Sequence, residues 1–113
     1  MKKLMLIVVL GLMAITALSA HPAANVKAQY DAKTSILTVE YGHKVRDASG
    51  HYIFNVTIEV NGKKMVEQNL SAQESLDGGT LVYKLANLTK GDQVKVTTDC
   101  NKGGKKSTTL NVP

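Results

Sequence analysis

Four side chains of this sequence could hold a metal ion, namely His21, His43, His51 and Cys100. They are all the histidines and the only cysteine of the 113-residue chain. Imidazole nitrogens and a thiolate suit iron, copper or zinc, whereas calcium and magnesium prefer oxygen ligands. The sequence has no Gly-rich phosphate loop, no serine in a nucleophile elbow and no close pair of cysteines. Metal chemistry therefore depends on whether these four residues, which are widely spaced in the sequence, meet in the folded chain.

The elements that would position them are β-strands. Between residues 26 and 112 apolar and polar residues alternate with a period of two, and turn residues such as Asn61-Gly62 interrupt the alternation. The predicted strands are residues 26–30, 37–41, 52–60, 65–70, 81–85, 94–98 and 108–112. In the third, the apolar row consists of Tyr52, Phe54, Val56, Ile58 and Val60. Seven short strands in about 93 residues indicate an all-β, immunoglobulin-like sandwich or barrel.

Strand order predicts which residues share one end of the sandwich, because successive strands run in alternate directions. His21 precedes the first strand, His43 ends the second, His51 opens the third and Cys100 ends the sixth. All four should therefore lie at the same end. His43 and Cys100 also continue inward-facing rows, so they should point toward each other. His51 has the parity opposite to the apolar row of its strand, and must either turn inward or face solvent.

Each of these residues also has an ordinary interpretation. Cys100 is the type of small residue that packs in a core. His43 and His51 could be loop residues, and His21 could be a disordered terminal residue. Four independent coincidences at one end are less economical than one shared cause, which favours a metal site.

The first twenty residues predict a secretory signal peptide. Lys2 and Lys3 supply the positive charge, residues 4–18 form an apolar run, and Ser19 and Ala20 are small. The run is shorter than the roughly 20 residues that span a bilayer, so we expect cleavage and no membrane association afterwards. Cleavage after Ser19 fits the small-residue rule best, whereas cleavage after Ala20 would make His21 the new N-terminus. Residues 21–113 would then form one periplasmic or secreted domain.

Composition narrows the functional classes further. Removal of Lys2 and Lys3 lowers the net charge from +5 to +3, with 12 basic and 9 acidic residues remaining. The basic residues are scattered and are not interleaved with aromatic ones, so nucleic-acid binding has little support. A single cysteine cannot form a disulfide within the chain, so the domain must fold without one.

Two segments of the chain resemble the iron-binding domain of superoxide reductases, the desulfoferrodoxin and neelaredoxin family. Residues 43–53, His-Lys-Val-Arg-Asp-Ala-Ser-Gly-His-Tyr-Ile, are similar to the family's His-Pro-loop-His-Tyr/His-Ile, in which both histidines bind iron. Residues 99–104, Asp-Cys-Asn-Lys-Gly-Gly, are similar to its Cys-Asn-x-His-Gly, in which the thiolate is the axial ligand. The chain departs from this pattern in three places. Lys44 replaces the proline, Gly103 replaces the last histidine, and only His21-Pro22 stands near the family's Glu-Lys-His-x-Pro segment.

The resemblance implies a seven-stranded immunoglobulin-like barrel with a mononuclear iron centre that reduces superoxide to hydrogen peroxide. It implies Cys100 as the axial donor, with His21, His43 and His51 as equatorial ligands. Water or a carboxylate of the loop 71–79, from Glu74 or Asp77, would replace the missing histidine.

We expect two further contributors to the reaction, one within the chain and one outside it. Lys44 would attract the superoxide anion. A separate electron donor would be needed, because the chain has no Cys-x-x-Cys module.

Two other functions stay open. One is a periplasmic copper- or zinc-binding module without turnover, which is favoured if cleavage exposes His21, because its amine and ring could chelate copper together. The other is a metal-free immunoglobulin-like interaction domain, with Cys100 in the core and the histidines on the surface.

Overall fold

All seven predicted strands occur in residues 21–113, the part of the chain that the computed structural model describes. The strands are β1 (Asn25–Asp31), β2 (Ile36–Gly42), β3 (Ile53–Val60), β4 (Lys63–Asn69), β5 (Gly78–Lys84), β6 (Gln93–Cys100) and β7 (Lys105–Asn111). The predicted signal peptide lies outside the described residues. Within residues 21–113 there is no helix that is long and apolar enough to cross a membrane.

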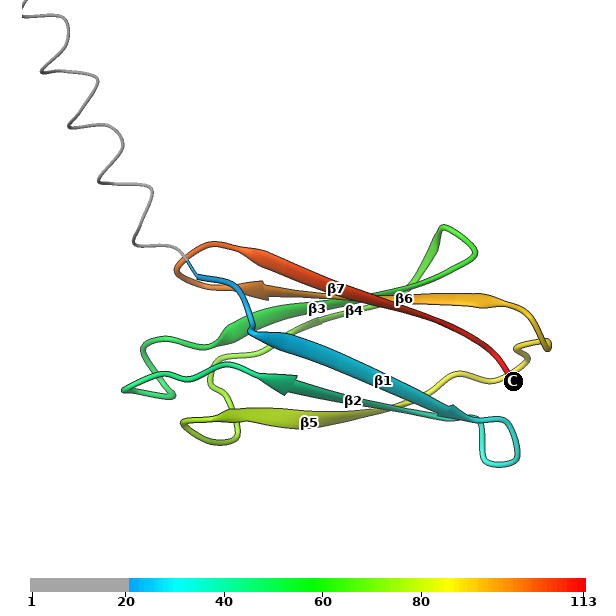
Figure 1. Ribbon diagram of the computed structural model, residues 1–113, viewed down its shortest axis with the longest axis horizontal. Helices are drawn as coiled ribbons and strands as arrows, with labels where there is room; N and C mark the ends of the chain where they lie inside the picture. Colours follow the sequence, from blue (N-terminus) through cyan, green and yellow to red (C-terminus); the bar gives the residue numbers. More distant parts are fainter. Residues whose placement is uncertain (1–20) are drawn as a thin grey trace, which may run out of the picture.

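The strands form two antiparallel sheets that pack face to face, as Figure 1 shows. One sheet has the order β1-β2-β5 and the other β4-β3-β6-β7. Asn61 and Gly62, which join β3 to β4, have φ angles of 51° and 84°. Positive φ at both central residues is what a type I′ hairpin turn requires. The predicted all-β, immunoglobulin-like sandwich is therefore confirmed.

The core lies between the sheets and is built from the alternating rows that the sequence indicates. The inward residues of the three central strands are Leu37, Val39 and Tyr41 of β2, Val56, Ile58 and Val60 of β3, and Val94, Val96 and Thr98 of β6. Each fully buried Val, Leu or Ile side chain contributes roughly 1.5–3 kcal/mol to folding relative to an exposed one. These rows fix the register of the strands and thus the positions of the residues at their ends.

The apolar row predicted for the third strand is wrong at its first two residues. Tyr52 and Phe54 are half-buried, whereas Ile53 is completely buried. The register between β3 and β6 shifts between Ile53 and Asn55, which is the mark of a β-bulge. The bulge uses one extra residue and reverses the parity, so Ile53 shares the inward face with Val56. By the same reversal His51, two residues before Ile53, returns to the inward side.

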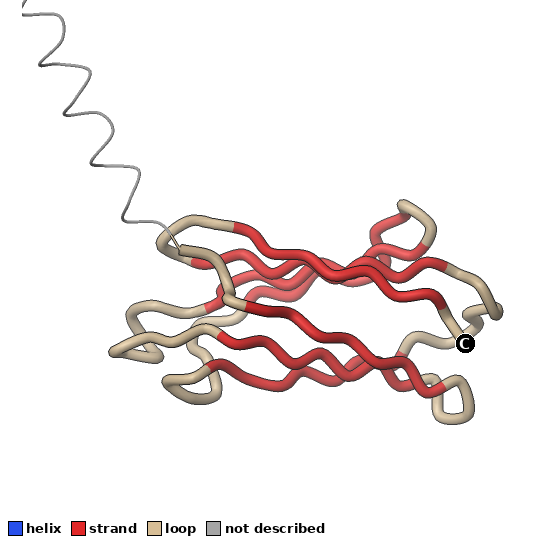
Figure 2. The backbone as a smooth tube through the Cα atoms, viewed as in Figure 1, coloured by secondary structure: helices blue, strands red, loops and turns tan. Residues whose placement is uncertain are grey.

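The loops gather at the two ends of the sandwich (Figure 2). Three connections meet at the end where β1 begins, namely residues 43–52, 71–77 and 101–104. Backbone hydrogen bonds join the first two, from His43 N to Asp77 O at 2.8 Å and from Val45 N to Leu76 O at 2.9 Å. At this end of the sandwich, hydrogen bonds therefore hold the loops 43–52 and 71–77 together on the scaffold of the two sheets.

Candidate metal centre

The three histidines meet at this end of the sandwich, as strand direction predicts. The ring centroids are 5.0 Å apart for His21 and His43, 4.4 Å for His21 and His51, and 4.9 Å for His43 and His51. One nitrogen atom of each ring lies within 4.8 Å of the corresponding nitrogens of the other two. No two rings stack, since the angles between their planes are 47°, 58° and 88°. Three imidazoles grouped in this way could bind one metal ion together.

His43 is the most deeply placed of the three. It follows the last residue of β2, continues the inward row of that strand and is only 1% exposed. Its Nδ1 atom lies 2.8 Å from Oε1 of Gln73, a buried residue of the loop 71–77. Its Nε2 atom is buried and has no hydrogen-bond partner among residues 21–113. A buried nitrogen without a partner is a cost to folding, and a bound cation would remove that cost.

His51 is held by a loop with its own internal hydrogen bonds. Its backbone N donates to the carbonyl oxygen of Asp47 at 2.9 Å. The Asp47 carboxylate accepts from the backbone N and the hydroxyl of Ser49, and these bonds lower the pKa of Asp47. The Nε2 atom of His51 is also buried, and within the described residues it has no hydrogen-bond partner.

The surroundings of His51 oppose its protonation. Burial lowers the pKa of its imidazole, and the positive charges of His21, His43 and Lys102 lower it further. The neutral form is the one that binds metal, so this environment favours the form of His51 that could act as a ligand.

His21 is the exposed member of the group. The segment that carries it is attached to both sheets. Ala23 is 2% exposed, and Ala24 N donates to Gly42 O at 2.7 Å. A side chain at Gly104, where φ is 110°, would place its Cβ 2.8 Å from the backbone nitrogen of Pro22. Glycine at this position therefore lets the β6–β7 turn pack against the residue next to His21.

Cys100 ends β6, faces the interior as predicted, and is 1% exposed. It pairs with Ile53 across the ladder, and its sulfur accepts a hydrogen bond from the backbone N of Lys102 at 3.4 Å. Cys100 is not a member of the compact three-histidine group. Lys102, two residues after Cys100, lines a pocket together with His21 and His51.

The two loop carboxylates considered as substitute ligands lie elsewhere. Glu74 and Asp77 line a separate hollow over β2 and β5, and the Glu74 carboxylate accepts from Thr80 N at 3.4 Å. Neither residue belongs to the three-histidine group.

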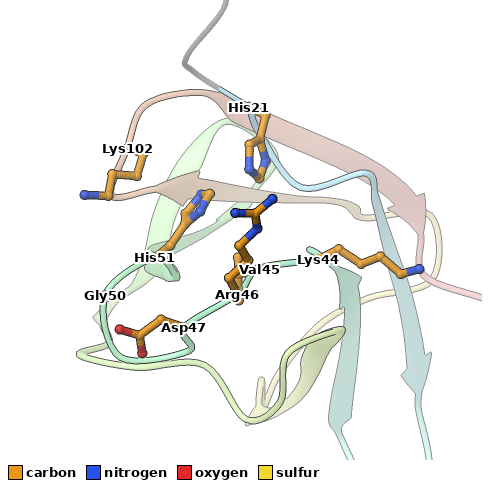
Figure 3. Close-up of a pocket in the computed structure, with 8 residues that line it drawn as sticks. All are labelled: His21, Lys44, Val45, Arg46, Asp47, Gly50, His51 and Lys102. Carbon is orange, nitrogen blue, oxygen red and sulfur yellow. The ribbon is translucent and has the colours of Figure 1, made fainter.

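A pocket of about 630 Å³ opens beside His21 and His51. Its lining residues are His21, Lys44, Val45, Arg46, Asp47, Gly50, His51 and Lys102. In Figure 3 the guanidinium group of Arg46 extends toward the rings of His21 and His51, whereas the ammonium groups of Lys44 and Lys102 point away from them. With three cationic side chains and one carboxylate, the pocket favours anions.

Sequence reasoning missed three residues of this site. Gln73 contacts His43, Arg46 faces the pocket, and Asn101 joins the β6–β7 turn to the loop of His51. Asn101 and Arg46 lie inside the two segments that resemble the superoxide reductase motifs, so a signal was available for both. Gln73 lies in a polar loop beside Glu74, and nothing in its spacing distinguishes it.

Comparison with known proteins adds no family assignment. No family model matches the chain, and no curated protein matches it significantly.

Proposed function

We propose that this protein is an exported metal-binding domain whose centre is formed by His21, His43 and His51. The observation that carries this proposal is the pair of buried nitrogens, His43 Nε2 and His51 Nε2, which have no hydrogen-bond partner in the described part of the chain. Each such orphan costs roughly 1–3 kcal/mol of stability. One transition-metal ion would use both lone pairs, and a third nitrogen is available from His21. An imidazole donor set suits iron, copper or zinc.

For the metal we propose iron, and for the activity the reduction of superoxide to hydrogen peroxide. Two features support this assignment: the resemblance of residues 43–53 and 99–104 to the superoxide reductase motifs, and the cationic pocket beside the histidines. Iron(II) held there would supply the one electron that, with two protons, converts superoxide to hydrogen peroxide. A separate donor must return that electron after each turnover.

The chain's own residues would divide the remaining tasks. His43 and His51 would bind the metal from inside the sandwich, and His21 would close the site from the surface. We propose Cys100 as a fourth donor, because residues 99–104 resemble the motif that supplies the axial thiolate, and Cys100 is buried at the end of β6, at the same end of the sandwich as the histidines. Arg46, whose guanidinium extends toward the rings, would attract the anion.

The second candidate is a copper- or zinc-binding module without turnover. The three-histidine group favours this candidate, because it contains three nitrogen donors and does not contain Cys100. Cleavage after Ala20 would add the terminal amine of His21 as a further nitrogen. The metal-free alternative is less favoured, because it leaves two buried nitrogens unpaired.

The deciding experiment is metal analysis of protein purified anaerobically from its native host. About one equivalent of iron, together with catalysed removal of superoxide, supports the reductase. Copper or zinc without turnover supports the second candidate. A His43→Ala, His51→Ala double variant should lose the metal while its far-UV spectrum stays β-like. Native protein that binds none of these metals would exclude both candidates.

A further inference from the structure

Gln73 is the only residue whose side chain is seen to hydrogen-bond a ring nitrogen of the three histidines within residues 21–113. It is 6% exposed, and both ends of its amide are engaged. Nε2 donates to the carbonyl oxygens of His43 at 2.7 Å and Ser75 at 2.9 Å. Oε1 lies 3.3 Å from the backbone N of Ile53 and 2.8 Å from Nδ1 of His43.

Backbone groups decide which end of this amide is the oxygen. The N–H of Ile53 can only donate, and the carbonyls of His43 and Ser75 can only accept. The opposite orientation would place the NH₂ group against a donor and the oxygen against two acceptors. Oε1 must therefore face His43 Nδ1. An amide oxygen only accepts, so the hydrogen of this bond belongs to Nδ1.

The position of that hydrogen determines what the other ring nitrogen can do. A neutral imidazole carries one ring hydrogen, so a hydrogen on Nδ1 leaves a lone pair on Nε2. This Nε2 is the atom that is buried without a partner. Resting on the proposed metal site, we infer that Gln73 is a positioning residue that keeps the proton of His43 on Nδ1 and presents Nε2 to the metal.

Gln73 also contacts the part of the loop 43–52 that leads to His51. Its backbone N donates to the carbonyl of Ala48 at 3.0 Å, inside the loop that leads to His51. Its Oε1 contacts the first residue of β3, just after that loop. One side chain thus links the orientation of the His43 ring to the position of the His51 loop. Partners of this kind typically change metal affinity about 10- to 100-fold when removed.

The tautomer can be tested without any metal. In ¹⁵N-labelled wild-type protein at about pH 8, where imidazoles are neutral, long-range ¹H–¹⁵N spectra distinguish protonated from unprotonated ring nitrogens. We expect a protonated Nδ1 and an unprotonated Nε2 for His43. A hydrogen on Nε2 would overturn the inference.

The positioning role requires variants and Co²⁺ as the probe. Gln73→Met keeps the length of the side chain but removes the acceptor, so Co²⁺ affinity should fall about 10- to 100-fold and the His43 tautomer should become mixed. Gln73→Glu keeps an acceptor for Nδ1–H, and its second oxygen, which would face the carbonyls of His43 and Ser75, can donate to them only when it is protonated. With that proton in place, Gln73→Glu should retain the tautomer and more of the Co²⁺ affinity than Gln73→Met. Gln68→Met is the matched control, because Gln68 is a half-buried glutamine of β4 that accepts from Tyr83. It should bind Co²⁺ like wild type.

The two proposals fail in different ways. If wild type shows the Nδ1–H tautomer but binds no Co²⁺, the metal site is wrong and the arrangement of Gln73 stands. If wild type binds Co²⁺ and folded Gln73→Met binds it equally well, the positioning role is wrong and the metal site stands. Should Gln73→Met fail to fold, the wild-type tautomer and the comparison of Gln73→Glu with wild type still decide the inference. Loss of the Nδ1–H tautomer in folded Gln73→Glu would also count against it.

Discussion

Asn101 Nδ2 donates a hydrogen bond of 3.1 Å to the carbonyl oxygen of Gly50, a residue 51 positions earlier in the chain. The Oδ1 atom of the same side chain accepts from Tyr52 N at 3.0 Å, and its backbone N donates to Tyr52 O at 3.0 Å. Asn101 thus holds the residues on both sides of His51. The β6–β7 turn, which follows Cys100, is in this way joined to the histidine loop.

Replacing Asn101 by alanine should weaken metal binding without unfolding the domain. The substitution removes both side-chain bonds to the loop of His51, so that residue loses its fixed position. We expect about 10- to 100-fold lower Co²⁺ affinity, as for other residues that orient ligands. The free energy of unfolding should fall by about 1–3 kcal/mol. Calorimetric titration and urea unfolding measure the two effects.

Asn61→Ala provides the control for Asn101. Asn61 also makes two side-chain bonds, to Asp92 at 3.0 Å and from Gln93 N at 2.9 Å, at the opposite end of the sandwich. Its φ of 51° adds backbone strain when alanine replaces it, so the loss of stability should be at least as large. Its Co²⁺ affinity should nevertheless equal that of wild type. Equal losses of affinity in both variants would mean that general destabilisation, and not loop position, causes the effect.

Substitution of Cys100 shows whether a thiolate binds the metal together with the histidines. If its thiolate binds the metal, oxidised iron-loaded protein should show a ligand-to-metal charge-transfer band, and Cys100→Ser should abolish that band. Cys100→Ala should do the same, with a stability change no larger than that of an ordinary core truncation. The measurement is the visible absorption spectrum beside the metal content. If Cys100→Ser keeps both the charge-transfer band and the metal content of wild type, Cys100 is only a core residue and does not bind the metal.

The pH dependence of the metal-free protein follows from His51. Burial and the neighbouring positive charges lower its pKa below 6.5 in the folded state. The unfolded chain then binds more protons below about pH 6.5, so the free energy of unfolding decreases as the pH falls through this range. Urea unfolding between about pH 8 and about pH 5 should show this decrease, and His51→Asn should reduce its slope.

Three carboxylates affect the stability only at a lower pH than His51 does. The carboxylates of Asp47, Glu67 and Asp92 have pKa values lowered from 3.8, 4.5 and 3.8, mainly by hydrogen bonds. Their contribution disappears only in more acidic solution. An identical slope above about pH 5 in wild type and His51→Asn would therefore rule out His51 as its source.

The period-two pattern predicted the fold well because the two faces of each central strand differ strongly. Leu37, Val39 and Tyr41 are buried and their neighbours are not, so the register of β2 is fixed and His43 follows inward. The same pattern failed at Phe54. A bulge depends on how β3 pairs with β6, which is a contact between distant segments that no local periodicity records.

The site itself was predictable only in part. The prediction that the three histidines share one end was correct, because the order of the strands alone determines at which end each histidine lies. Their partners depend on loop geometry, which a sequence does not encode in any simple period. Gln73 reaches His43 only because the loops 43–52 and 71–77 are hydrogen-bonded together. Gly103 has a φ of 105°, so the histidine that the superoxide reductase motif has at this position would be strained here.

If the site reduces superoxide, Arg46 should contribute more than Lys44 to attracting the anion. Both line the pocket, but only the Arg46 guanidinium extends toward the histidine rings in Figure 3. Electrostatic steering raises association rates by about 10- to 1,000-fold and falls steeply with salt. In iron-loaded protein, Arg46→Ala should therefore slow the second-order reaction with superoxide about 10-fold at low ionic strength, and Lys44→Ala should slow it less.

The control for this comparison is Lys90→Ala, which removes the same charge from the loop between β5 and β6, at the other end of the sandwich. It should react nearly as fast as wild type. Arg46→Lys should recover part of the rate, because it restores the charge but not the planar guanidinium. The difference between wild type and Arg46→Ala should shrink at about 1 M salt, where the screening length falls to about 3 Å. Pulse radiolysis gives the rate constants. Equal rates for Arg46→Ala and Lys90→Ala would show that the anion does not approach through this pocket.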